Sequence, residues 1–334
     1  MPGRREAALG LLGGMLLPGL GCAQGQPQGQ AQAPAQPAWP ERPPRWVVGY
    51  PAGGPSDTFA RLLATAISPG LGQTMVVENR PGGGAVLASE TVARSAPDGY
   101  TLLHADNGNL VYNPALYRRL PYDPDRDLTG VGFIGRFPLF LVVRPEGVAS
   151  FAAFRALARQ RPPTYGSPAV ASPHHLAMEM LKRRAGFDAT HVPYRGGPAA
   201  MQDLLSGTVD SVLIDCATGI PFIRERKVRA LVVLSEARSA QAPQVPTALE
   251  LGVDKAVAFG WQAMSAPAGT PQPIIDRLNA EMRNAIASQG MQARMRGLGI
   301  ESAPWSPAEL NDFVGRENAM WRPLIRELGI RLDT

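Results

Sequence analysis

The sequence has few cysteines, no apolar run long enough to cross a membrane, and no block of charge of one sign. Its 334 residues contain two cysteines, Cys22 and Cys216. If an N-terminal signal is removed after residue 23, only Cys216 remains, so no intrachain disulfide can form and packing must stabilise the fold. Because no segment offers ~20 uninterrupted apolar residues, a membrane-spanning helix is not expected. The formal net charge of +5 is not gathered into a basic patch with aromatic residues, so we do not expect nucleic acid as a partner.

Motifs of several enzyme classes are absent as well. The chain has no H-E-x-x-H zinc motif, no G-x-x-x-x-G-K-[ST] phosphate loop and no G-x-S-x-G nucleophile elbow. Gly82-Gly83-Gly84 lacks the full G-x-G-x-x-G pattern of a dinucleotide site. His175 and Glu179 have the i, i+4 spacing of two metal ligands, but no third ligand follows, and helix capping or packing is favoured. We therefore predict no metal, no other cofactor and no enzymatic activity.

The N-terminal residues predict export. Arg4 and Arg5 precede an apolar run at 7–20, and the small residues 21–23 follow, as in a secretory signal peptide. We expect residues 1–23 to be removed and the protein to be periplasmic; lipid anchoring at Cys22 is the alternative, and the arginine pair leaves open the Sec and twin-arginine routes. Residues 24–44, rich in Gln, Pro, Ala and Gly, predict a flexible linker.

The rest of the chain predicts two α/β lobes. A length of 334 residues and a hydrophobic content of 45% suit two domains. From Trp46 onward, predicted strands alternate with predicted helices, which indicates a mostly parallel sheet with helices on both faces. The predicted segments include a polar loop at 105–109, helices at 151–160 and 220–226, a helix at 174–184 with Ser172 as its N-cap, and a helical tail at 273–288, 291–298 and 307–328. Extended segments at Leu139 to Val143 and Val257 to Met264 predict two crossings between the lobes. We expect one lobe at 45–138 plus 263–334 and the other at 139–262.

The segment Arg45 to Ile67 predicts a strand, a glycine-rich turn and a helix that opens at Ser56 or Asp57. Both residues are good N-caps, and the apolar residues that follow have helical spacing. Free backbone N–H groups at Gly53, Gly54 and Ser56, with the positive end of the helix dipole behind them, predict a seat for a carboxylate. The alternative is a tight strand-to-helix connection that binds nothing.

Other loops at strand ends supply further candidates, because ligands of open α/β sheets bind beyond the carboxyl ends of the strands. Asn107 follows a strand of the first lobe, and four polar residues follow strands of the second: Ser167, Ser172, Tyr194 and Asp215. We predict that these loops face each other across a cleft that closes on the ligand. Ser167 or Ser172 could instead be a nucleophile with His174 or His175 as its base, but donors to a bound carboxylate are favoured.

Several motifs run in order from about Arg45 to the C-terminus: Tyr50-Pro51-Ala52-Gly53-Gly54-Pro55-Ser56-Asp57, Glu78-Asn79-Arg80-Pro81-Gly82-Gly83-Gly84, Pro97-Asp98-Gly99-Tyr100-Thr101-Leu102-Leu103, Asn113-Pro114-Ala115-Leu116-Tyr117, His191-Val192-Pro193-Tyr194-Arg195-Gly196 and Ala266-Pro267-Ala268-Gly269-Thr270-Pro271. Together they resemble the signature of the Bug-type periplasmic receptors of tripartite tricarboxylate transporters.

The resemblance implies a two-lobed Venus-flytrap fold. It implies a monomeric receptor that captures a small carboxylate, such as a dicarboxylate, an amino acid or an aromatic acid, and delivers it to membrane permease subunits. A sensor for a membrane partner and a secreted hydrolase are the alternatives. The binding positions implied by the family are these: Gly53, Gly54, Ser56 and Asp57 on one lobe, and Ser167, Ser172, Tyr194 and Asp215 on the other.

The chain departs from the resemblance between Ser167 and His174, where similar receptors have a Gly/Ser-rich loop. Pro168 and Pro173 each remove a backbone donor, so the seat of the second lobe is expected to be narrower or less polar. Two aspartates also need a role beside an anionic ligand. We expect Asp57 to cap its own helix and Asp215 to accept hydrogen bonds from an amino or hydroxyl group of the ligand.

Export can be tested directly. The charged start, apolar run and small residues predict cleavage after Ala23, so N-terminal sequencing of protein recovered from the cell envelope should begin at Gln24. Protein that retains Met1, or that stays in the cytoplasm, would contradict this prediction.

Overall fold

The computed structural model describes residues 39–332, so the predicted signal peptide and most of the predicted linker lie outside the described residues. Within this range the strands form one sheet in the order β2-β1-β3-β9-β4-β7-β5-β6, with β8 also paired to β4. The strands are β1 (Arg45–Val48), β2 (Val76–Asn79), β3 (Thr101–Asp106), β4 (Leu128–Val143), β5 (Thr164–Ser167), β6 (Thr190–Pro193), β7 (Ser211–Asp215), β8 (Arg229–Val233) and β9 (Phe259–Pro267).

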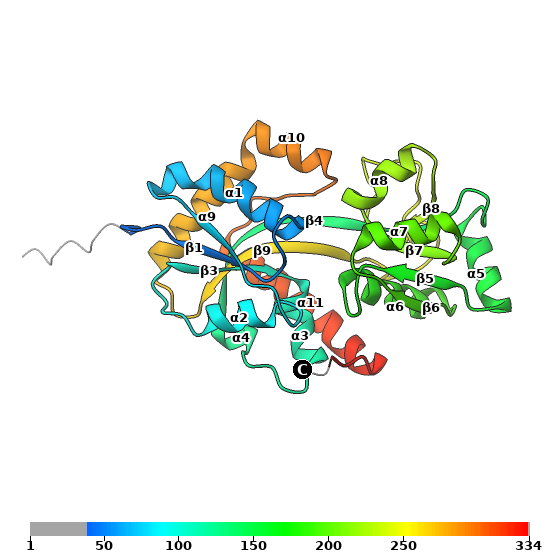
Figure 1. Ribbon diagram of the computed structural model, residues 1–334, viewed down its shortest axis with the longest axis horizontal. Coiled ribbons are helices and arrows are strands. Elements are labelled where there is room, and N and C mark those ends of the chain that lie inside the picture. Colours follow the sequence, from blue (N-terminus) through cyan, green and yellow to red (C-terminus); the bar gives the residue numbers. More distant parts are fainter. Residues whose placement is uncertain (1–38, 333–334) are drawn as a thin grey trace, which may run out of the picture. The chain divides into compact units, whose positions relative to one another are not determined.

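Helices flank both halves of the sheet (Figure 1). They are α1 (Pro55–Leu71), α2 (Val86–Ala93), the π-helical turn η1 (Asn107–Tyr112), α3 (Asn113–Leu116), α4 (Pro124–Asp127), α5 (Phe151–Gln160), α6 (Pro173–Ala185), α7 (Gly197–Ser206), α8 (Cys216–Arg224), α9 (Gln272–Ala287), α10 (Gln289–Gly297) and α11 (Pro307–Leu328).

Two long strands connect the halves, and both predicted crossings are confirmed. β4 is 16 residues long and pairs with β9 from Leu128 to Pro138. From Leu139 onward its partners are β7 and β8 instead. Figure 1 shows β4 and β9 running side by side from the α1–α9 half to the α7–α8 half. The change of partner falls where we expect the second lobe to begin, although the described residues form one compact unit and the lobe boundaries stay a prediction.

The expectation of a mostly parallel sheet is wrong. The pairs β1–β2, β1–β3, β5–β6 and β5–β7 are parallel, whereas β3–β9, β4–β7, β4–β8 and β4–β9 are antiparallel. The antiparallel pairs all involve a crossing strand. A strand that enters or leaves a half of the sheet without an intervening crossover helix can run against its neighbours, and strand–helix alternation alone does not reveal this.

Alternation along β1 places apolar side chains on both faces of the sheet. Trp46 and Val48 join an apolar cluster with α1 and α9, and Val47 joins a second cluster on the opposite face. This second cluster, which we call the continuous cluster, extends through both halves of the sheet from Val47 to Phe154 and includes Trp321 of α11. A third cluster lies only beneath α7 and α8. One face of the sheet is therefore packed without interruption, and the other face has two separate cores.

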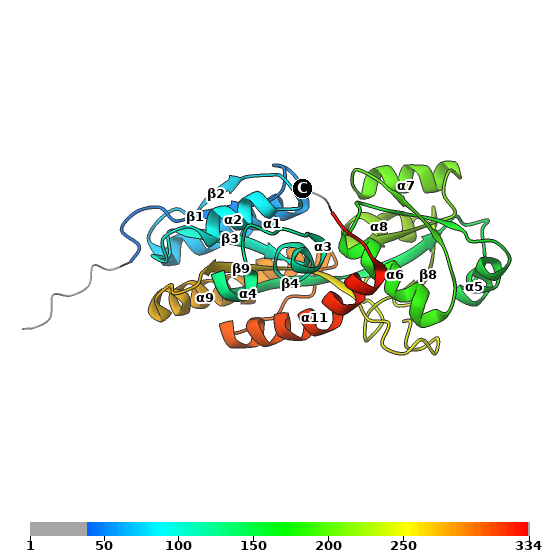
Figure 2. The ribbon, with the colours of Figure 1, turned by 90° about the horizontal axis from the view of Figure 1, so that it is seen from below.

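Helix α11 extends along the crossing strands toward α6 (Figure 2). The indole Nε1 of Trp261, on β9, donates to the Glu317 carboxylate at 2.9 Å. Near the end of α11, Glu327 forms an ion pair with Arg183 of α6 at 2.6 Å. The C-terminal helix thus contacts both halves of the described chain.

Arg136 of β4 forms a second connection between the halves. Its Nη atoms donate to both oxygens of Glu236, which follows β8, at 3.2 and 3.1 Å. Its Nε donates to Glu301, which follows α10, at 2.9 Å. The guanidinium also lies 3.8 Å from the ring centroid of Phe259, at the start of β9. One side chain therefore connects both crossing strands to an acidic residue from each half.

Two predicted segments differ from the structure. The segment 105–109, predicted as a polar loop, contains the last two residues of β3 and the start of η1, which is closed by a capping box between Asp106 and Asn109. The predicted helix from Ile220 begins earlier, at Cys216, because Asp215 caps it. The long tail helices lie where apolar periodicity predicts them.

Candidate functional site

The candidate site consists of the loops that follow the parallel strands. β1 is parallel to β2 and β3, and β5 is parallel to β6 and β7, so within each half the loops leave the same edge of the sheet. The loop after β1 carries four of the predicted ligand residues: Gly53, Gly54, Ser56 and Asp57. The loops after β5, β6 and β7 carry Ser167 and Ser172, Tyr194, and Asp215 respectively.

The loop after β1 starts its helix earlier than predicted. α1 begins at Pro55, and Gly54 is its N-cap, so neither Ser56 nor Asp57 caps it. Gly54 has no side chain to offer, and the end of the helix carries no side-chain cap. The prediction that the N–H groups of Gly53 and Gly54 are free is also wrong. Gly53 donates to Asp57 Oδ2 at 2.9 Å, and Gly54 donates to the carbonyl of Pro51 at 3.3 Å.

Asp57 is directed into the protein. Only 3% of the residue is exposed. Arg61 contacts both carboxylate oxygens, with Nε at 3.0 Å and Nη2 at 2.9 Å. The hydrogen bond from Arg61, together with that from Gly53, lowers the pKa of Asp57 from 3.8 to about 2. The carboxylate is therefore ionised and neutralised within its own loop, which keeps its charge away from an anionic ligand.

Ser56 differs from Asp57 in that its side chain is not fully used by hydrogen bonds within the protein. Its Oγ accepts a hydrogen bond from the side-chain amide of Gln262 at 3.1 Å, and 9% of the residue is exposed. Among the described residues, no hydrogen bond uses the hydroxyl proton of Ser56 as a donor to another group. Of the predicted residues in this loop, Ser56 keeps a polar hydrogen for a ligand.

Asn107 is buried among structural partners. It is fully enclosed, its amide nitrogen donates to the carbonyl of Phe259 at 3.2 Å, and its amide oxygen accepts from the N–H of Trp261 at 2.8 Å. Both polar ends of the side chain therefore hold η1 against β9. Its predicted role in ligand binding stays a prediction, but here the side chain serves the crossing strand.

The two predicted serines of the second half donate to the same carbonyl group. The hydroxyls of Ser167 and Ser172 donate to the carbonyl of Ala169, at 3.0 and 2.8 Å. Ser172 also caps α6 by accepting from the N–H of His175 at 3.2 Å. Each hydroxyl has one proton, so both protons are used to close the loop on itself. The N-cap predicted at Ser172 is confirmed.

Histidines complete this loop. His191 Nε2 lies 2.7 Å from Ser167 Oγ, and with Ser167 donating to the carbonyl of Ala169, the ring is the donor of this second hydrogen bond. His175 Nδ1 accepts from the N–H of Ala171 at 2.9 Å. The ring of His175 stacks on that of His191, with the two ring centroids 3.7 Å apart. Burial lowers the pKa of His191 to about 4 and that of His175 to about 3. Both rings are neutral near pH 7, and the Nδ1 of His175 is already occupied by the N–H of Ala171.

Glu179, the other half of the possible metal pair, also has partners. Its carboxylate accepts from Tyr165 Oη at 2.6 Å and pairs with Lys182 at 2.8 Å. Between residues 39 and 332, no group of three or more His, Cys, Asp or Glu side chains is placed to hold a metal ion. The i, i+4 spacing of His175 and Glu179 therefore serves two separate packing contacts.

Tyr194 is held at the start of the next loop. Its hydroxyl donates to Asp203 Oδ2 at 2.8 Å, and its backbone N–H donates to the carbonyl of Ser167 at 2.9 Å. Burial, with a smaller contribution from Asp203, raises the pKa of Tyr194 to about 12. Beyond it, Gly196 is the N-cap of α7 and has no side chain to cap that helix.

Asp215 takes the role that we predicted for Asp57. It is the N-cap of α8, accepting from the N–H of Thr218 at 2.9 Å. His174 Nε2 lies 3.3 Å from its other oxygen. Burial alone would raise the pKa of Asp215, but the hydrogen bonds and charge of its surroundings, chiefly from His174, lower it overall. The carboxylate expected to accept from the ligand is thus engaged by its own helix.

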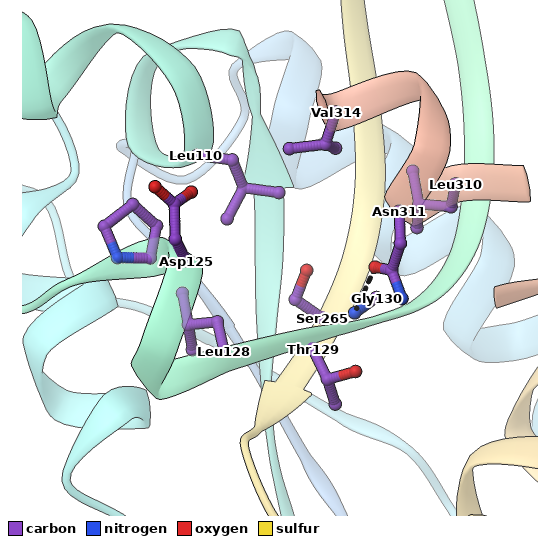
Figure 3. Close-up of a pocket in the computed structure, with 10 residues that line it drawn as sticks. Leu110, Asp125, Leu128, Thr129, Gly130, Ser265, Leu310, Asn311 and Val314 are labelled. Carbon is purple, nitrogen blue, oxygen red and sulfur yellow. Dashed lines mark hydrogen bonds between the residues drawn. The ribbon is translucent and has the colours of Figure 1, made fainter. Parts of the chain in front are cut away.

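Two hollows in the described chain lie away from these loops. Figure 3 shows the first, a cavity of ≈ 40 Å³ beneath α11, with Leu110, Ser265 and Leu310 around it and Asn311 accepting from the N–H of Gly130 at 3.1 Å. The second is an open hollow of ≈ 370 Å³ beside Val86 and Leu120. Neither is lined by a residue predicted to bind ligand, and the first is too small for an organic acid. The strand-end loops therefore remain the candidate site on the strength of their chemistry.

Comparison with known proteins identifies the class. Residues 59–330 match the family described as "Tripartite tricarboxylate transporter family receptor". The chain belongs to this family. Protein BugT of Bordetella pertussis is 35% identical over 298 residues, which cover 88% of this chain and 91% of BugT.

Two solved structures are similar to this chain over most of its length. Rpa4515 of R. palustris, described with adipate, has a TM-score of 0.78 and 33% identity, and the match covers 89% of this chain and 100% of that one. MatC (Rpa3494) from Rhodopseudomonas palustris, described with bound malate, has a TM-score of 0.75 and 31% identity, covering 86% of this chain and 100% of that one.

These matches confirm three predictions. The chain is a Bug-type receptor, its fold is the two-lobed α/β fold of periplasmic binding proteins, and it is a solute-binding receptor rather than an enzyme. Receptors of this family are periplasmic binding proteins. Between residues 39 and 332, no helix combines the length and the apolar character needed to cross a membrane.

Sequence reasoning missed three residues that shape the site: Arg61, which neutralises Asp57; His191, which holds Ser167; and Gln262, which holds Ser56. Arg61 carried a signal, since it stands four residues after Asp57 on a predicted helix. His191 and Gln262 are separated from their serines by 24 and 206 residues, so no local pattern reveals these contacts.

The environment of Asp57 predicts how pH affects stability. Because its pKa is lower in the folded protein, its contribution is present above pH 3.8 and is lost as pH falls toward 2. Asp57→Asn should reduce the free energy of unfolding by about 1 kcal/mol at neutral pH. This value is smaller than the pKa shift alone would give, because the partner Arg61 is half-exposed and solvent screens the ion pair. Urea denaturation across this pH range should show wild type and variant converging toward low pH. Asp254→Asn, at an exposed position, is the control; a pH-independent deficit in Asp57→Asn would contradict the assignment.

The cap at Asp215 predicts a second stability effect. Asp215→Ala removes the acceptor for the Thr218 N–H and should cost about 1 kcal/mol, whereas Asp215→Asn keeps a capping oxygen and should cost less. Chemical denaturation at neutral pH compares the two variants. Equal stability of wild type and Asp215→Ala would show that the cap seen here contributes nothing.

Proposed function

We propose that this receptor captures a small carboxylate in a cleft between its two lobes, acts as a monomer outside the cytoplasm, and delivers the ligand to the permease subunits of a tripartite tricarboxylate-type transporter. The observation that carries the proposal is the loop after β1. It combines an uncapped helix end at Gly54 with a serine hydroxyl that is free to donate. Both features favour an anionic hydrogen-bond acceptor.

The charges around this loop support the same ligand class. Asp57 is nearby, but its carboxylate is paired with Arg61 and Gly53, so it does not place an unbalanced negative charge at the mouth of the loop. His104, fully buried on β3, has its pKa lowered to about 4 by burial and is neutral near pH 7. A carboxylate would therefore be held by oriented donors and not by a counter-ion.

Dicarboxylates are the first candidates within this class. The two ligand-bound relatives are described with adipate and malate, which both carry two carboxylates. In the second half the hydroxyls of Ser167 and Ser172 are used within their own loop, so a second carboxylate would depend on other donors. Amino acids and aromatic acids remain in the set of ligands to be tested.

Ligand binding can be measured by thermal shift. A ligand that binds only the native state raises the free energy of unfolding by ~2.7 kcal/mol at a hundredfold excess over its dissociation constant. Adipate, malate, other di- and tricarboxylates, amino acids and aromatic acids should give shifts for some compounds and none for others. The diamides of the diacids that bind, which have the same length and no charge, should give much smaller shifts.

Two results would contradict the proposal. The first is equal stabilisation by a diacid and its diamide, because the loop would then not select an anion. The second is the absence of a shift with every carboxylate in the panel while the protein shows a cooperative melting transition.

A further inference from the structure

Gln262 lies where the first half of the sheet meets the crossing strands. It is on β9, in register with Asp106 of β3 on one side and with Gly135 of β4 on the other. Only 7% of the residue is exposed. From this position its side-chain nitrogen reaches across to Ser56 Oγ at 3.1 Å. A buried side chain of the crossing strand therefore contacts the one hydroxyl of the loop after β1 that keeps its proton.

The chemistry of the two groups sets the direction of this hydrogen bond. An amide nitrogen can only donate, so the oxygen of Ser56 must accept. A hydroxyl has a single proton, and here that proton remains available for a second partner. By occupying an acceptor position of Ser56, Gln262 orients the hydroxyl as a donor.

Neighbouring groups do not compete for that proton. Asp57, the next residue, has both carboxylate oxygens bound by Arg61. His104 lies on β3, two residues from the partner of Gln262, and neither of its ring nitrogens is hydrogen-bonded to Ser56. The Ser56 hydroxyl is therefore left for a group that enters from outside the loop.

We propose that Gln262 is a positioning residue that sets the ligand preference of this loop: by donating to Ser56 it makes the serine a donor and favours a carboxylate over a carboxamide. The inference rests on the proposed function. A carboxylate oxygen only accepts, so it always matches a fixed donor. A carboxamide presents an acceptor on one side and a donor on the other, and it gains less from a donor of fixed direction.

Gln262→Glu reverses this arrangement without changing the size of the side chain. A carboxylate at 262 would accept the Ser56 proton and place a negative charge beside the incoming anion. Affinity for the better binder of adipate and malate should fall roughly tenfold or more, because a hydrogen bond to a charged group is lost and repulsion is added. Affinity for the matching diamide should change less, so the ratio of diacid to diamide affinity should fall.

The chain supplies a matched control at Gln292. Its side-chain nitrogen donates to Ser302 Oγ at 3.0 Å, the same pair of groups at nearly the same distance, but on α10 and away from the loop after β1. Gln292→Glu should leave both affinities unchanged. Calorimetric titration of wild type and of both variants with diacid and diamide, combined with melting curves of the unliganded proteins, gives the complete comparison.

A second variant keeps the test decisive if Gln262→Glu does not fold. Gln262→Met removes the donor without adding charge, and it is combined with Ser56→Ala in a double-mutant cycle of diacid affinity. If Gln262 acts through Ser56, the effect of Gln262→Met should largely disappear in the Ser56→Ala background. Additive losses would show that Gln262 has a packing role only and would overturn the inference.

The remaining outcomes are separable from a failure of the proposed function. If wild type binds a diacid and Gln262→Glu keeps the same ratio of diacid to diamide affinity, the inference is wrong and the proposed function stands. If wild type binds no carboxylate, both are wrong.

Discussion

Strands β4 and β9 pair in antiparallel fashion from Leu128 opposite Pro267 to Pro138 opposite Phe259, and the positions of the other strands follow from this pair. β3 is added on the free side of β9, and the second half of the sheet is built on the continuation of β4. Backbone hydrogen bonds thus carry the connection between the halves, and Arg136 reinforces it with Glu236 and Glu301. Lobes joined by paired strands are restricted to bending and twisting of the pair, which is compatible with the cleft closure that we predict from the sequence.

The candidate site shows how loops rich in polar residues can still offer few free donors. The carboxylate of Asp57 takes the N–H of Gly53, and Ser167 and Ser172 donate to a single carbonyl. These internal bonds fix the conformations of the loops, since a polar group near the surface that finds a partner within the chain loses its freedom to rotate. In the function that we propose, ligand recognition falls to the few groups left over, and the direction of their hydrogen bonds is the determinant of specificity.

The periodicity of apolar residues, together with the Gly, Pro and capping residues at the ends of segments, predicted much of the fold. The helices at 151–160 and 307–328, the cap at Ser172 and the crossing at 139–143 are local features, and each agrees with the structure. Strand direction was not predictable in the same way, because it depends on how distant segments pair. At the site, residue identity did not show which of two aspartates caps a helix. That choice is made by backbone geometry: Asp215 stands at the turn of α8, whereas Asp57 is inside the first turn of α1.

The continuous cluster has a consequence for how the protein unfolds. Its buried side chains extend from Val47 in the first half to Phe154 in the second without a break, while the opposite face has two separate cores. Two lobes with independent cores would be expected to melt in two steps. Because these lobes share one apolar layer, losing either would expose the buried surface of the other, and a single cooperative transition is the natural result. Cooperative unfolding of the described residues is thus assigned to one face of the sheet.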